Sequence, residues 1–158
     1  MSPYMPAPAS IGLLFVRIVV GIAFVLHGLP KIEHPTNWMH GHGLTIPGSG
    51  LTFGVPSWLQ AAVAAVEFFG GFALVFGVLT RLAGVLLFGD MLVAFVFSEL
   101  PRHVAWVGGG HTLEPNLTYL AVSFLLLLAG PGAFSIDATV ITAARRKRVH
   151  RRNVPFAA

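Results

Sequence analysis

Cysteine is absent from this 158-residue sequence, and charged residues make up only 10% of it. Without cysteine there is no disulfide bond, thiolate metal site or thiol relay, which excludes four-helix membrane enzymes that link disulfide formation to quinones. The low charge, the 55% of hydrophobic residues and a mean hydropathy of +0.78 exclude an ordinary water-soluble domain.

Long apolar runs take the place of charge in this sequence. A helix needs about 20 mostly apolar residues to cross the ~30 Å hydrocarbon layer of a bilayer. Four runs are candidates, and the third is rather short. They cover Ser10–Leu29, Ser57–Leu79, Leu82–Phe97 and Leu117–Phe134. We therefore expect an all-α integral membrane protein in which four transmembrane helices form an antiparallel bundle, with the second and third held together by a short turn.

The expected organisation is one membrane domain between two short flanking segments. An N-terminal segment covers residues 1–9, the membrane domain covers residues 10–137, and a basic tail covers residues 138–158. The first ten residues contain no Lys or Arg, so the charged region of a secretory signal peptide is missing. We expect the first apolar helix to be retained.

The distribution of basic residues predicts the orientation in the membrane. Arg81 lies between the second and third runs, on the same side as the tail, whereas the opposite loops carry only Lys31 and Arg102. The positive-inside rule then predicts that both termini are cytoplasmic. The tail is expected to meet anionic lipid headgroups rather than nucleic acid, because no recognition motif accompanies its charge. Its basic residues are Arg145, Arg146, Lys147, Arg148, Arg151 and Arg152.

Three ionisable residues lie within the expected spans: Arg17, Glu67 and Asp90. At 1.5 Å per residue, Arg17 is ~10 Å and Asp90 ~13 Å from the cytoplasmic edge, and Glu67 is ~15 Å from the outer edge. Because unpaired charges are costly at this depth, we predict that Arg17 bridges the two carboxylates. The cluster is a candidate catalytic, proton-linked or ligand-binding site, and a purely structural clasp is the alternative.

His27 and Lys31 stand at the outer end of the first run, four residues apart and on one face if the helix continues through Pro30. A neutral imidazole both donates and accepts hydrogen bonds near neutral pH. His27 and Lys31 are therefore candidate ligand-binding residues for a quinone, with packing at the membrane interface as the alternative for His27.

The outward loops also contain histidines that are weak candidates for a metal site, although we predict no metal. His40 and His42 are two residues apart, which does not place two ligands on one helix face. A polar cap, with Trp38, Trp58 and Trp106 as interfacial anchors, accounts for the loops. The histidines considered are His34, His40, His42, His103 and His111.

The order of several short motifs resembles the DoxX family of small bacterial four-helix membrane proteins, over about residues 10–140. The motifs are Arg17, the stretches at 27–31 (HGLPK) and 67–71 (EFFGG), and those at 76–81 (FGVLTR) and 130–137 (GPGAFSID). The resemblance implies a bacterial inner-membrane location and a link to redox physiology, since related DoxD-type subunits belong to a thiosulfate:quinone oxidoreductase. The long first loop and the basic tail depart from typical members.

Three functions remain open from the sequence. The first is a quinone-associated subunit of a membrane redox complex, linked to sulfur chemistry or oxidative stress. Such a subunit needs partner redox proteins, because the chain has no cofactor-binding motif of its own. The second is a non-enzymatic accessory or scaffold subunit. The third is a transporter, which four short helices would form only by oligomerising.

Overall fold

The computed structural model describes residues 6–108 and 112–152, without the side chains of residues 145–152. Its first helix, α1 (Ala7–Glu33), continues through Pro30, as expected for a residue whose ring removes one hydrogen bond without forcing an end. The second, α2 (Ser57–Phe76), starts directly after Pro56. Between them lies a loop with two short antiparallel strands, β1 (Leu44–Thr45) and β2 (Thr52–Phe53).

The third and fourth helices differ in length from the expectation. α3 (Thr80–Ala94) continues as a π-helical turn (Phe95–Glu99) and a 3₁₀ turn (Leu100–Arg102), so that helical structure extends over 23 residues. α4 (Leu113–Ala129) has 17 residues and ends five residues before the predicted limit. The short helix is therefore the fourth, and the prediction of a short third span is wrong.

Three described helices are long and apolar enough to cross a membrane: α1, α2 and α3 with its extension. α4 is apolar but slightly shorter than the ~20 residues of a typical span. The protein is thus an all-α membrane protein, as predicted.

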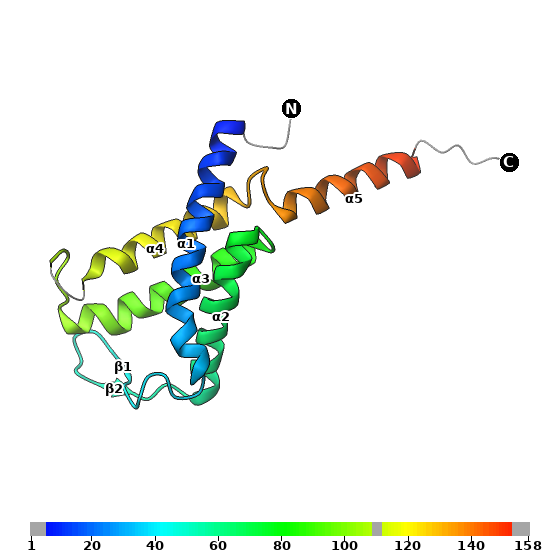
Figure 1. Ribbon diagram of the computed structural model, residues 1–158. Helices are drawn as coiled ribbons and strands as arrows, with labels where there is room; N and C mark the ends of the chain where they lie inside the picture. Colours follow the sequence, from blue (N-terminus) through cyan, green and yellow to red (C-terminus); the bar gives the residue numbers. More distant parts are fainter. Residues whose placement is uncertain (1–5, 109–111, 153–158) are drawn as a thin grey trace.

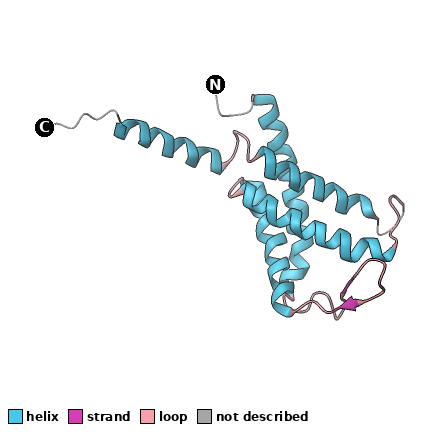
Figure 2. Ribbon diagram, turned by 180° about the vertical axis from the view of Figure 1, so that it is seen from behind, coloured by secondary structure: helices cyan, strands magenta, loops and turns pink. Residues whose placement is uncertain are grey.

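The helices form two antiparallel pairs, α1 with α2 and α3 with α4, which cross each other (Figure 1). The start of α1, the turn between α2 and α3, and a further helix α5 (Ile136–Arg152) lie at one end, called here the α5 end. The strands and the α3–α4 connection lie at the other end, called the loop end (Figure 2). α5 projects away from the bundle, so part of the predicted basic tail is helical.

Glycines bring the backbones of α1 and α2 into direct contact. A Cβ atom on Gly21 would lie 2.7 Å from the carbonyl oxygen of Gly71, and one on Gly71 would lie 2.7 Å from that of Gly21. Nearer the loop end, a Cβ on Gly28 would lie 2.6 Å from the amide nitrogen of Phe68. Small residues of this kind allow close helix approach in membranes. The core between the two pairs contains the buried side chains of Leu13, Val20, Phe24, Leu74, Leu87 and Leu126.

The α5 end is closed by contacts between segments far apart in sequence. Gly77 ends α2 in a left-handed conformation (φ 66°), and the amides of Gly77 and Val78 bond back to Leu74 and Ala73 in a Schellman arrangement. Asp137, in the first turn of α5, accepts hydrogen bonds from the amides of Leu79 (2.8 Å) and Thr80 (2.9 Å). This carboxylate therefore caps the start of α3.

Candidate functional site

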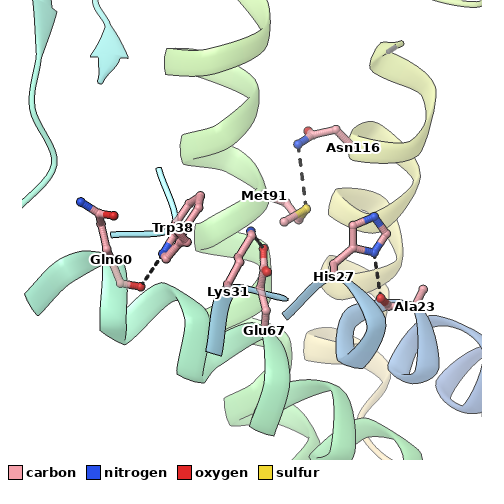
Figure 3. Close-up of polar contacts among 8 residues, drawn as sticks. All are labelled: Ala23, His27, Lys31, Trp38, Gln60, Glu67, Met91 and Asn116. Atoms are coloured by element: carbon pink, nitrogen blue, oxygen red, sulfur yellow. Dashed lines mark hydrogen bonds and ion pairs between the residues drawn. The ribbon is translucent and has the colours of Figure 1, made fainter. Parts of the chain in front are cut away.

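A buried ion pair joins α1 to α2 near the loop end. The Lys31 ammonium lies 2.6 Å from Glu67 Oε1 (Figure 3). The Glu67 side chain is only 3% exposed, whereas the Lys31 side chain is 24% exposed. The close approach of α1 and α2 at Gly28 lets these two side chains meet, since they stand on facing surfaces of the two helices.

Trp38, in the loop after α1, covers this ion pair. Lys31 Nζ lies 4.4 Å from the centre of the Trp38 ring, within the range of a cation–π interaction. The indole Nε1 donates a hydrogen bond of 2.8 Å to the carbonyl of Gln60. The Gln60 side chain in turn accepts from the Met39 amide (3.2 Å) and donates to the carbonyl of Val55 (2.9 Å). One buried glutamine thus fixes the loop over the site.

Asp90 brings a second carboxyl group from α3. It is half-buried and interacts electrostatically with the Glu67 carboxyl group and with the charge of Lys31. Glu67 Oε2 and Asp90 Oδ2 are buried and find no hydrogen-bond partner among the described residues. The site therefore contains two acidic side chains and one basic side chain, and two of its acceptor oxygens have no hydrogen-bond partner among the described residues.

The neighbouring side chains of α1 and α4 are aromatic or amide groups. His27 is exposed, bonds through Nδ1 to the carbonyl of Ala23 at 2.8 Å, and meets the edge of Tyr119 at 5.6 Å between ring centres. Because a carbonyl only accepts, Nδ1 carries the hydrogen, and the Nε2 of a neutral ring is an acceptor. Asn116 donates a weak bond of 3.9 Å to the sulfur of Met91, and its Oδ1 is buried without a partner among the described residues.

Arg17 is not part of this site, so the predicted Arg17–Glu67–Asp90 cluster is wrong in that member. Its guanidinium donates to three carbonyl groups at the α5 end: Leu74 (3.0 Å), Val75 (3.5 Å) and Pro131. Lys31 lies 14 residues further along α1, about 21 Å away at 1.5 Å per residue. The depth estimate failed because it gave only the height of each Cα atom and not the face of the helix from which the side chain projects. Lys31 occupies the position beside Glu67 that was predicted for Arg17.

The structure also shows where the other predicted site residues lie. His27 and Lys31 do lie on one continuous helix, but Lys31 pairs with Glu67 rather than acting with His27 alone. The loop histidines His34, His40, His42 and His103 are exposed, and His111 lies outside the described residues. Over residues 6–108 and 112–144, no three His, Asp or Glu side chains are grouped so that they could hold a metal ion.

Sequence reasoning missed Gln60 and Tyr119, and it treated Trp38 only as an interfacial anchor. A glutamine one turn into an apolar helix is a signal that could have been used, because buried amides need partners. Trp38 gave no comparable signal. Its place over Lys31 depends on the path of the loop, which no periodicity describes.

Comparison with known proteins places these features in a family context. The family model described as DoxX matches residues 12–100, which include most of α1 and the whole of α2 and α3. "Inner membrane protein YqjF" of Escherichia coli is 35% identical over 131 residues, covering 81% of this chain and 91% of the relative. "Putative oxidoreductase CatD" of Bacillus subtilis is 31% identical over 140 residues, covering 89% of this chain and 95% of the relative.

A membrane protein of Mycobacterium tuberculosis is 30% identical over 132 residues, covering 77% of each chain. No solved structure matches the chain significantly. The matched region contains Lys31, Trp38, Glu67 and Asp90, so the ion pair lies within the part of the chain that the family model describes.

Proposed function

The chain belongs to the DoxX family of membrane proteins, and we propose that it is a quinone-binding subunit of a membrane redox complex in the bacterial inner membrane. The observation that carries this proposal is the partly exposed Lys31 ammonium, held between Glu67 and the Trp38 ring. The name of the relative CatD, a putative oxidoreductase, supports the direction of the proposal.

The chemistry of the site suits a quinone headgroup. A quinone carbonyl needs a hydrogen-bond donor, and the Lys31 ammonium has three N–H groups, of which one meets Glu67. A quinol hydroxyl needs an acceptor, and His27 Nε2 is available as one when the ring is neutral. Trp38, over Lys31, and Tyr119, against His27, supply flat aromatic surfaces. Electrons would come from a partner redox protein, in keeping with a subunit rather than a complete enzyme.

Quinone binding is measurable through Trp38. In a Trp58→Phe, Trp106→Phe background, Trp38 is the sole tryptophan, since the sequence has three. We expect short-chain ubiquinone or menaquinone, added to the purified protein in detergent, to quench its fluorescence in a saturable manner. Lys31→Met should weaken this binding tenfold or more, because a hydrogen bond to a charged group contributes about 1.5–3 kcal/mol.

Arg102→Met is the matched control, because it removes another outward cation that is exposed on the 3₁₀ turn after α3. Its quinone affinity should equal that of the background protein. Unsaturable quenching, or equal affinity in the Lys31→Met and Arg102→Met proteins, would contradict the quinone proposal.

A non-enzymatic accessory subunit is the second candidate, and Arg17 favours it. The guanidinium of Arg17 is 1% exposed and bonds to backbone carbonyls of α2 and of the segment after α4. A charge in the apolar interior is thus used here to hold the bundle together, with no ligand required. Isolation in mild detergent of a stoichiometric protein partner, with no quinone extracted from the complex, would favour this candidate.

A further inference from the structure

Only one oxygen of the Glu67 carboxylate has a hydrogen-bond partner among the described residues. Oε1 is fully engaged by Lys31 at 2.6 Å, while Oε2 is buried with no partner among the described residues. At 3% exposure, the side chain has almost no access to water that could satisfy this second oxygen. A buried acceptor without a donor costs about 1–3 kcal/mol, and more when the group is charged.

The carboxyl group of Asp90 is also incompletely hydrogen-bonded. It interacts electrostatically with that of Glu67, and its Oδ2 is buried without a partner in the described part of the chain. Two ionised carboxylates only accept hydrogen bonds, so neither can satisfy the other. A single proton between them changes this, because a protonated carboxyl group donates to its ionised neighbour.

The charges around Glu67 and Asp90 also favour the binding of one proton. α1 contributes Lys31 and, further toward α4, His27; α2 contributes Glu67; and α3 contributes Asp90. From α4, the polar groups near the pair are the neutral Asn116 and Tyr119, and the acidic Glu114 in the first turn is exposed. Two ionised acids beside one ammonium leave a net charge of −1 in a low-dielectric region, which is unfavourable.

We propose that Glu67 and Asp90 bind one proton between them, with Lys31 balancing the remaining negative charge. The loop end of the bundle is then a proton-binding site, and the partly exposed Lys31 side, beneath Trp38, is where the proton exchanges with water. This site goes beyond the quinone proposal and does not require it, since the charge balance is the same whether or not a ligand is present.

Infrared spectroscopy of the purified full-length protein tests the proposal. A protonated carboxyl group has a C=O band that is separate from those of carboxylates and amides and that shifts in D₂O. With only six Asp and Glu residues in the chain, such a band is assignable by substitution. We expect it at neutral pH, and we expect both Glu67→Gln and Asp90→Asn to remove it, because the single acid left is then ionised beside Lys31.

Two further variants test the assignment of the infrared band. Glu114→Gln, which alters an exposed acid in the first turn of α4, should leave the band unchanged. Lys31→Met should double its intensity, because both acids must then be neutral. Circular dichroism and gel filtration establish that each variant is folded.

Absence of the band at neutral pH, or its persistence in both Glu67→Gln and Asp90→Asn, would overturn the proposal. Stabilisation of the parent protein by Na⁺, without the band and lost in Glu67→Gln, would instead identify a metal cation site and would also overturn it. The quinone proposal is tested separately by Trp38 quenching. The band can therefore be present when quinone fails to bind, and quinone can bind when the band is absent.

Discussion

At the scale of single residues, the buried charges of this protein have two different roles. Glu67 interacts with Lys31 and with a second acid, so its surroundings are charged, and its Oε2 has no hydrogen-bond partner among the described residues. Arg17 meets only carbonyl oxygens among its side-chain hydrogen bonds, near the C-terminal end of α2 and in the segment after α4. A guanidinium has five N–H donors in a rigid fork, which allows it to serve several carbonyls at once.

Arg17→Met should therefore lower stability without affecting the loop end. Each hydrogen bond to a charged group contributes about 1.5–3 kcal/mol, so we expect a loss of roughly 2–4 kcal/mol, seen as a lower melting temperature in detergent. Trp38 quenching by quinone and the carboxyl infrared band should be retained in the folded variant, because Arg17 lies about 21 Å along α1 from Lys31.

Arg81→Met is the control for this substitution, because Arg81 is exposed and makes one long bond of 3.4 Å to the carbonyl of Leu128. Its melting temperature should stay close to that of the parent. Equal losses in the Arg17→Met and Arg81→Met proteins would show that the three buried carbonyl contacts contribute little.

At the scale of helices, the distance between α1 and α2 determines whether the ion pair can form. Gly21 and Gly71 place the two backbones in contact, and Gly28 does the same against Phe68 one to two turns nearer the loop end. Lys31 and Glu67 follow directly on these contacts. The glycines are therefore part of the geometry of the site, although they carry no chemistry.

Gly71→Ala should separate α1 from α2, because the new Cβ would lie 2.7 Å from the Gly21 carbonyl and 2.8 Å from the Val25 amide. Overpacking of this kind costs about 1–3 kcal/mol, more than the ~1 kcal/mol that alanine gains over glycine in a helix. We expect a lower melting temperature and weaker quinone quenching of Trp38.

Gly89→Ala provides the matched comparison in α3, since nothing lies within 4 Å of a Cβ at that position. It should be neutral or slightly stabilising. Similar melting temperatures for the Gly71→Ala and Gly89→Ala proteins would mean that the α1–α2 contact is looser than the structure describes.

At the scale of the whole molecule, the lengths of the helices bear on how many of them cross the bilayer. α1, α2 and α3 with its extension are long enough, and α4 has 17 residues. A helix slightly shorter than the bilayer is accommodated at modest cost by local thinning of the lipid. From the concentration of Lys and Arg at the α5 end and the positive-inside rule, we propose that this end is cytoplasmic and that all four helices span.

Single cysteines test this topology cleanly, because the natural chain has none. We expect a membrane-impermeant maleimide to label Ser49→Cys, in the exposed loop beside β1 and β2, in intact spheroplasts. Ala144→Cys, exposed on α5, should be labelled only after permeabilisation. Labelling of both from outside would mean that α4 does not cross, and the reverse pattern would invert the orientation.

Much of this architecture follows from the sequence alone. Apolar runs of membrane-spanning length predicted the all-α membrane fold, because the bilayer requires every backbone group to be satisfied within a helix. The same physics marked Glu67 and Asp90 as unusual, and the two carboxyl groups do interact electrostatically. The order of motifs such as Glu67–Gly71 and Phe76–Arg81 led to the DoxX family, which the family model confirms.

Tertiary structure alone decided which cation meets these acids. Depth along a helix is calculable from residue number, but the face that a side chain presents depends on how the helices cross, and the position of Trp38 depends on a loop fixed by Gln60. Arg17 was assigned a carboxylate from its charge and its calculated depth, yet helix ends far apart in the sequence offered it carbonyl groups. Such acceptors belong to every residue equally and leave no trace in the sequence until the chain is folded.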